Sequence, residues 1–125
     1  LASAPPVAVS GDDRVEGGRA AVAAMLAQAD PPDAAFAAND AIALGALEAL
    51  DRAGANVPAD FGVIGFDGLA AGAQAHPPLT TIEPDFAEAG RALVSRICEP
   101  GGEPTRRVPV RLIERGSVRP VRPRG

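Results

Sequence analysis

Residues 34–86, AAFAANDAIALGALEALDRAGANVPADFGVIGFDGLAAGAQAHPPLTTIEPDF, decide the fold. This stretch contains two apolar runs typical of buried strands, AAFAA and FGVIGF. Each run ends on polar residues, Asn39-Asp40 after the first and Asp67 after the second. In an open parallel sheet, groups that bind small molecules lie just beyond the carboxyl ends of the strands. We therefore expect Asn39 and Asp67 to face one crevice.

Apolar runs and turn signals alternate along the rest of the chain. Prolines and glycines separate segments whose apolar residues repeat at strand or helix spacing. The expected strands are residues 6–10, 34–38, 61–66, 79–82 and 108–113, and the expected helices are residues 17–29, 40–52, 69–75 and 86–98. This alternation predicts βαβ units with right-handed crossovers. We expect an α/β fold, a three-layer Rossmann-like arrangement with a mostly parallel sheet.

Helix caps can also be predicted from the polar residues at the helix starts. Asp12 or Asp13 is a candidate N-cap for the first helix, and Asn39 or Asp40 for the second, because short oxygen-bearing side chains satisfy the free N–H groups there. Gly54 is expected to close the second helix.

Composition excludes several classes of protein. A chain of 125 residues that is 46% hydrophobic supports one core of ordinary size. The single cysteine, Cys98, forms no internal disulfide, and no Cys/His pattern indicates a metal, so we expect neither metal nor cofactor and a reducing, cytoplasmic location. No apolar run approaches the ~20 residues that span a bilayer, and we expect no membrane anchor or signal peptide.

Catalysis and nucleotide binding find no support in the sequence. His76 and Cys98 are the lone residues of their types, without a base or nucleophile placed beside them, so we expect no enzyme. Gly11, Gly17 and Gly18 do not form a dinucleotide or phosphate-loop fingerprint.

Charge is distributed unevenly. Seven of the twelve basic residues, all arginines, lie between Arg106 and Arg124, whereas the body of the chain is acidic. A basic tail can indicate nucleic-acid binding, but this one has Pro120 and Pro123 and no aromatic residues. We expect a solvated tail, flexible over residues 115–125, and no direct DNA binding by the acidic body.

Three motifs in residues 36–86 carry a resemblance to a known family. FAANDAIALGALEAL, VPADFGVIGFD and HPPLTTIEPDF follow one another with the order and spacing of the LacI/GalR transcriptional regulators, which the chain resembles from about Val7 to Ser117. The resemblance implies a periplasmic-binding-protein-like (type I) effector domain made of two α/β subdomains. It implies that residues 1–125 are the C-terminal subdomain and that residues 86–98 belong to the other, absent one. DNA would be bound through an absent helix-turn-helix module.

The same resemblance implies ligand contacts by Asn39, Asp67, Phe86 and Asp13. Each has a plainer alternative: Asn39 can simply cap a helix, Asp67 can form an Asx turn before Gly68, and Phe86 can be a core residue. Asp13 departs from the family pattern, which often has an aromatic there. Asp67 is the preferred anchor, because a carboxylate accepts strong hydrogen bonds from hydroxyls.

Dimerisation is also implied by the resemblance. The helix at 40–52 would present Leu44 and Leu47 to a second copy, together with Leu69 and the segment that follows it. The alternative for the two helix leucines is ordinary core packing.

The sequence therefore predicts the effector-sensing domain of a dimeric LacI-type regulator that binds a sugar or similar small polar ligand in a cleft. The alternative is a sugar-binding receptor of a transport system, which shares the fold and binds no DNA. A third interpretation is an interaction domain whose cleft has lost its ligand.

Overall fold

The computed structural model describes residues 12–99, 101 and 105–120. Strands and helices alternate along this part of the chain, in the order α1 (Val15–Leu26), β1 (Ala34–Phe36), α2 (Asp40–Arg52), β2 (Gly62–Phe66), α3 (Ala70–Gln74), β3 (Thr80–Pro84), α4 (Phe86–Cys98) and β4 (Val110–Ile113). The strand expected at residues 6–10 lies outside the described residues.

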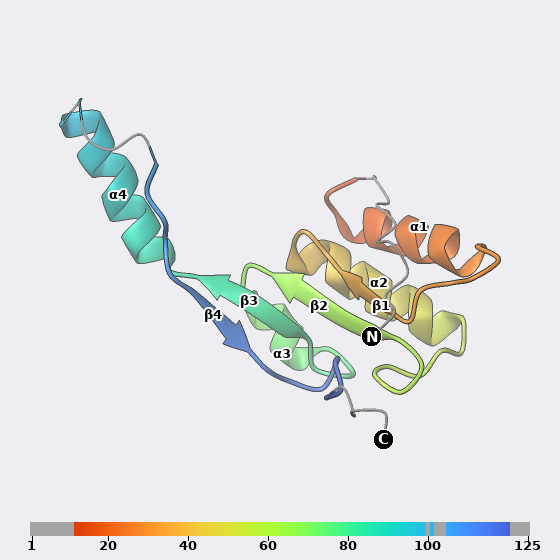
Figure 1. Ribbon diagram of the computed structural model, residues 1–125. Coiled ribbons are helices and arrows are strands. Elements are labelled where there is room, and N and C mark those ends of the chain that lie inside the picture. Colours follow the sequence, from red (N-terminus) through yellow and green to blue (C-terminus); the bar gives the residue numbers. More distant parts are fainter. Residues whose placement is uncertain (1–11, 100, 102–104, 121–125) are drawn as a thin grey trace, which may run out of the picture.

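The four strands form one sheet in the order β1-β2-β3-β4 (Figure 1). β1 pairs with β2 and β2 with β3 in parallel, whereas β4 returns antiparallel to β3. Parallel pairing follows from the helices α2 and α3, which carry the chain back to the starting end of the sheet after β1 and β2. The predicted α/β fold with a mostly parallel sheet is confirmed.

Glycines allow α1 and α2 to pack with their backbones in contact. A Cβ on Gly18 of α1 would stand 2.0 Å from the carbonyl oxygen of Ile42, and one on Gly45 of α2 would stand 1.9 Å from that of Val15. α1 begins at Val15 after Arg14, and no side chain caps it. The predicted cap at Asp12 or Asp13 is therefore wrong; Asp12 instead accepts a hydrogen bond from the Arg14 amide at 3.0 Å.

The hydrophobic core lies where α1 and α2 pack over the sheet. It is built mainly from aliphatic side chains, including Val22, Leu50, Val63 and Leu79, which are 0–2% exposed. Leu47 belongs to this core and is 5% exposed. The expectation that Leu47 is exposed for a dimer contact is wrong, because the helix turns this side chain inward.

The segment after β4 is part of the body. Ser117 is 0% exposed. Its hydroxyl donates to the carbonyl oxygen of Val63 at 2.6 Å and accepts from the Thr80 amide at 2.8 Å. The Val63 amide in turn donates to the Ser117 carbonyl at 2.8 Å. The Arg115 amide also donates to the Thr80 hydroxyl, and the Gly116 amide donates to the Pro78 carbonyl. A flexible tail over residues 115–125 is therefore wrong for residues 115–117; residues 121–125 lie outside the described part.

Helix α4 projects away from the body at the end of the β3–β4 ribbon (Figure 1). Its apolar side chains Leu93, Val94 and Ile97 are 61–80% exposed. The amphipathic pattern of residues 86–98 predicted this helix correctly. Its membership of a second subdomain stays a prediction.

Candidate functional site

The carboxyl ends of β1 and β2 meet at one edge of the sheet, because the two strands are parallel. Asn39 follows β1 and is the N-cap of α2: its Oδ1 accepts from the Ile42 amide at 2.8 Å. Its Nδ2 donates to the Asp13 carbonyl oxygen at 2.9 Å. Asn39, not Asp40, is therefore the cap. A side-chain amide has two donors and two acceptor lone pairs, so half of its capacity stays open to a ligand.

Asp67 follows β2 and has an unusual backbone. Its φ is +114°, a region that non-glycine residues rarely adopt. An Asx turn would need the Leu69 amide, but that amide donates to Asp40 Oδ2 at 2.7 Å. The Asx-turn alternative is thus wrong. Within the described part of the chain, the carboxylate of Asp67 accepts no hydrogen bond, so its full acceptor capacity is open.

Asp40 joins the two strand ends, a role that the sequence did not predict. Its side chain is 0% exposed. Oδ1 accepts from the Thr81 hydroxyl at 2.6 Å, and Oδ2 accepts from the Leu69 amide. Thr81 Oγ1 accepts from the Gly68 amide at 3.3 Å. The sequence signal was the polar pair Asn39-Asp40 inside an apolar segment.

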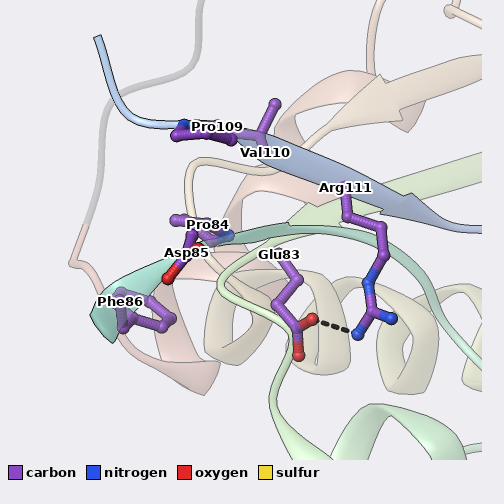
Figure 2. Close-up of a pocket in the computed structure, with 7 residues that line it drawn as sticks. All are labelled: Glu83, Pro84, Asp85, Phe86, Pro109, Val110 and Arg111. Carbon is purple, nitrogen blue, oxygen red and sulfur yellow. Dashed lines mark hydrogen bonds and ion pairs between the residues drawn. The ribbon is translucent and has the colours of Figure 1, made fainter. Parts of the chain in front are cut away.

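Phe86 lies in a hollow of about 410 Å³ at the start of α4 (Figure 2). The hollow is lined by residues from the end of β3 and from the start of β4: Glu83, Pro84, Asp85, Phe86, Pro109, Val110 and Arg111. Phe86 is 59% exposed, so it is not a core residue within this chain. Asp85 caps α4 by accepting from the Glu88 amide at 2.8 Å.

Glu83 connects this hollow to the Asp67 loop. Its carboxylate pairs with Arg111 across the β3–β4 ribbon (Figure 2). Its methylene atoms cover Gly68, where a Cβ would stand 2.7 Å from Glu83 Cγ. The hollow therefore adjoins the segment that carries Asp67.

The structure brings three of the four predicted ligand residues to one edge. Asp13 and Asn39 are in direct contact, and Asp40 ties the start of α2 to the loop of Asp67. Phe86 stands apart in the neighbouring hollow. This edge presents carboxylate and amide groups, which suit a small ligand rich in hydroxyl groups.

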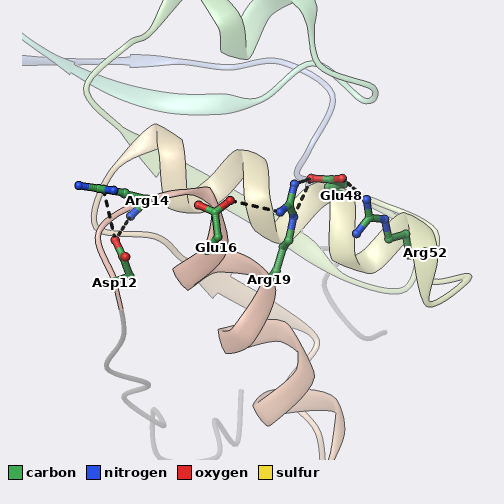
Figure 3. Close-up of polar contacts among 6 residues, drawn as sticks. All are labelled: Asp12, Arg14, Glu16, Arg19, Glu48 and Arg52. Atoms are coloured by element: carbon green, nitrogen blue, oxygen red, sulfur yellow. Dashed lines mark hydrogen bonds and ion pairs between the residues drawn. The ribbon is translucent and has the colours of Figure 1, made fainter.

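Ion pairs elsewhere join α1 to α2 (Figure 3). Glu48 accepts from Arg19 at 2.6 Å and from Arg52 at 2.5 Å, and Arg19 also pairs with Glu16. The hydrogen bond from Arg19 lowers the pKa of the Glu48 carboxyl below its usual value; desolvation partly offsets this, and attraction to Arg19 and Arg52 adds to it. The same bond raises the pKa of Arg19. The side chains of Arg19 and Glu48 are 37% and 36% exposed, and that of Arg52 is 66% exposed.

Metal binding and membrane insertion find no support in the described residues. No group of three or more His, Cys, Asp or Glu side chains in them could hold a metal ion. Among the described helices, none has the length and apolar character to cross a bilayer.

The fold defines the class of protein, an α/β domain built on a mostly parallel sheet. A family model described as a periplasmic binding protein-like domain matches residues 2–118, and the chain belongs to this family. The predicted resemblance to LacI/GalR regulators is confirmed by relatives and by solved structures.

Proteins similar to this chain include two repressors and a further LacI family transcriptional regulator. The chain is 38% identical over 116 residues to the ribose operon repressor of Escherichia coli K12, a match that covers 88% of the chain and 35% of the repressor. It superposes on the lac repressor dimer bound to operator and the anti-inducer ONPF with a TM-score of 0.78 and 33% identity, covering 86% of this chain and 39% of that one. A LacI family regulator from Enterococcus faecium with bound ribose gives a TM-score of 0.70 and 33% identity, covering 87% and 42%. The chain thus spans about a third of its curated relative's length.

Proposed function

We propose that this chain is the effector-sensing part of a LacI-type transcriptional regulator and that it binds a sugar or a similar small polar ligand. The carboxylate of Asp67 carries the proposal: it is preferred as the anchor because it stands at the carboxyl edge of the sheet without a partner in the described residues. Ligand hydroxyls would donate to Asp67 in charge-assisted hydrogen bonds. The side-chain amide of Asn39 would donate hydrogen bonds to other ligand hydroxyls and accept hydrogen bonds from them.

Two further residues would complete the contact. Asp13 is held beside Asn39 and would accept from a ligand hydroxyl, which favours a polar ligand over a simple pyranose face. Phe86 would cover the apolar face of the ligand from the hollow at the β3–α4 junction. The ribose bound to the Enterococcus faecium regulator supports a sugar as the ligand class.

The mechanism would be a population shift. A ligand that binds one arrangement of the domain better than another moves the equilibrium by its difference in affinity. The regulator would act in the cytoplasm as a homodimer, reaching DNA through a helix-turn-helix module outside residues 1–125. The lac repressor dimer on its operator supports that assembly. Leu69, 44% exposed, and the half-buried Leu44 would lie in the dimer contact, whereas Leu47 would not.

The alternative, a transport receptor, is not favoured. It shares the fold, but the ribose operon repressor and the lac repressor, to which the chain is similar, are repressors by name.

Thermal unfolding of the full-length protein against ribose, other sugars and sugar phosphates tests the proposal. A ligand at 100 times its dissociation constant stabilises a protein by about 2.7 kcal/mol. We expect a shift that Asp67→Ala abolishes and that Asp51→Ala, an exposed aspartate near the end of α2, leaves intact. A wild-type protein that responds to none of the panel, or an Asp67→Ala variant that responds fully, would contradict the proposal.

A further inference from the structure

The loop that carries Asp67 is held in an unfavourable backbone conformation. Asp67 has φ +114° and Gly68 has φ +74°, so two successive residues lie in the left-handed half of the backbone map. Glycine adopts this region freely, but aspartate does so only under constraint from its surroundings. The loop therefore needs fixed contacts on its far side to keep this shape.

Those contacts converge on one buried carboxylate. Asp40 accepts from the Leu69 amide at 2.7 Å and from the Thr81 hydroxyl at 2.6 Å, and Thr81 Oγ1 accepts from the Gly68 amide at 3.3 Å. The two backbone amides that follow Asp67 thus both lead to Asp40, one directly and one through Thr81. The Asp67 amide itself donates to the Ile82 carbonyl at 2.8 Å.

The position of Asp40 makes this a link between the two candidate ligand residues. Asp40 is the first residue of α2 and follows Asn39 directly. It is 0% exposed, so it acts on a ligand only through other groups. Gly65 of β2 leaves the space that the carboxylate fills, because a Cβ there would stand 2.2 Å from Asp40 Oδ1.

We propose that Asp40, together with Thr81, is a positioning pair for the effector site: it fixes the Asp67 loop relative to the start of α2, and so fixes the spacing between Asp67 and Asn39. This rests on the proposed function. When the loop relaxes, only the fraction of molecules with the correct spacing binds ligand. The apparent dissociation constant then rises in inverse proportion to that fraction.

Adjacent threonines provide a matched test. Thr80 and Thr81 are both buried in β3, 1% and 0% exposed. Thr80 Oγ1 accepts from the Arg115 amide at 2.9 Å, so its hydroxyl supports the segment after β4 and not the Asp67 loop. Thr80→Val and Thr81→Val each remove one buried hydroxyl from the same strand. Both are expected to lower the unfolding midpoint.

The experiment measures ribose affinity by calorimetry in the full-length protein, or the affinity of whichever panel sugar stabilises the wild type. We expect Thr81→Val to weaken binding about tenfold, as for a loop that is correctly placed in roughly a tenth of molecules. Thr81→Ser keeps the hydroxyl and is expected to bind within about threefold of wild type. Thr80→Val is expected to bind as wild type does, despite its lower midpoint. Asp40→Asn replaces one of the two acceptor oxygens with an NH2 donor, so it cannot accept from both the Leu69 amide and the Thr81 hydroxyl, and it is expected to weaken binding.

Amide exchange at Leu69 provides a readout that needs no ligand. We expect faster exchange of this amide in Thr81→Val and Asp40→Asn, and wild-type exchange in Thr80→Val. Equal losses of affinity in Thr80→Val and Thr81→Val, or wild-type affinity in Thr81→Val, would overturn the positioning role alone. A wild-type protein that binds no sugar would overturn the proposed function, and the positioning role with it.

Discussion

Gly45 of α2 lies against the backbone of Val15 in α1, so closely that a Cβ at Gly45 would stand 1.9 Å from the Val15 carbonyl oxygen. Gly18 makes the reciprocal approach from α1 to Ile42. The two helices therefore lie closer together than any side chain at these positions permits.

Gly45→Ala is expected to destabilise the fold by about 1–3 kcal/mol, because α1 must move away from α2. Urea unfolding measures the change. Gly90→Ala is the control and is expected not to destabilise the fold. Gly90 lies within α4, where an added Cβ would meet no atom within 4 Å. Alanine is also more favourable than glycine in a helix, by up to about 1 kcal/mol. A Gly45→Ala variant as stable as wild type would contradict the close packing.

Leu47→Ala is expected to cost about 2–5 kcal/mol of unfolding free energy, as for other buried leucines. Leu69→Ala, at a residue that is 44% exposed, is expected to change stability little and to weaken self-association. Urea unfolding and sedimentation of the full-length protein separate the two effects. If Leu47→Ala abolished self-association without lowering the unfolding free energy, Leu47 would belong to the dimer contact and not to the core.

Ser117→Ala is expected to destabilise the fold by about 1–3 kcal/mol, because it leaves the buried Thr80 amide and Val63 carbonyl without their side-chain partner. Ser95→Ala, at an exposed position on α4, is the matched control and is expected to have a small effect. If Ser117→Ala and Ser95→Ala were equally stable in thermal unfolding, the prediction of a flexible tail from the charge pattern would hold for Ser117 as well.

Glu48 provides a pH-dependent prediction. Its folded pKa is lowered, so its ion pairs stabilise the fold above the unfolded pKa, about 4.3, and this stabilisation is lost as the pH falls through the lower folded value. Glu48→Gln is therefore expected to be less stable than wild type at pH 7 and to approach it near pH 3. Urea unfolding at several pH values measures the difference. Glu114→Gln, an exposed glutamate, is the control; a difference for Glu48→Gln that grows toward low pH would contradict the assignment.

Periodicity and turn residues predicted most elements, because each depends on neighbours in the chain. Residues 40–52 and 86–98 show helical spacing with clear stops, and both are helices in the structure. The edge that carries Asn39 and Asp67 was predictable for the same reason: alternating strands and helices imply a parallel sheet, and polar residues follow both strands. The carboxyl ends of such strands meet by geometry.

Tertiary structure alone decided which side chains that edge leaves open. A helical pattern cannot tell a core leucine from an interface leucine, and only the packing of α2 on the sheet buries Leu47. The basic charge of the last residues predicted a solvent-exposed tail. In the structure, however, the Val63 carbonyl of β2 and the Thr80 amide of β3 are hydrogen-bonded by the side chain of Ser117. The sequence predicted Asp40 only as a candidate helix cap. Its function as the link to Leu69 and Thr81 depends on contacts 29 and 41 residues away, which exist only once the sheet has formed.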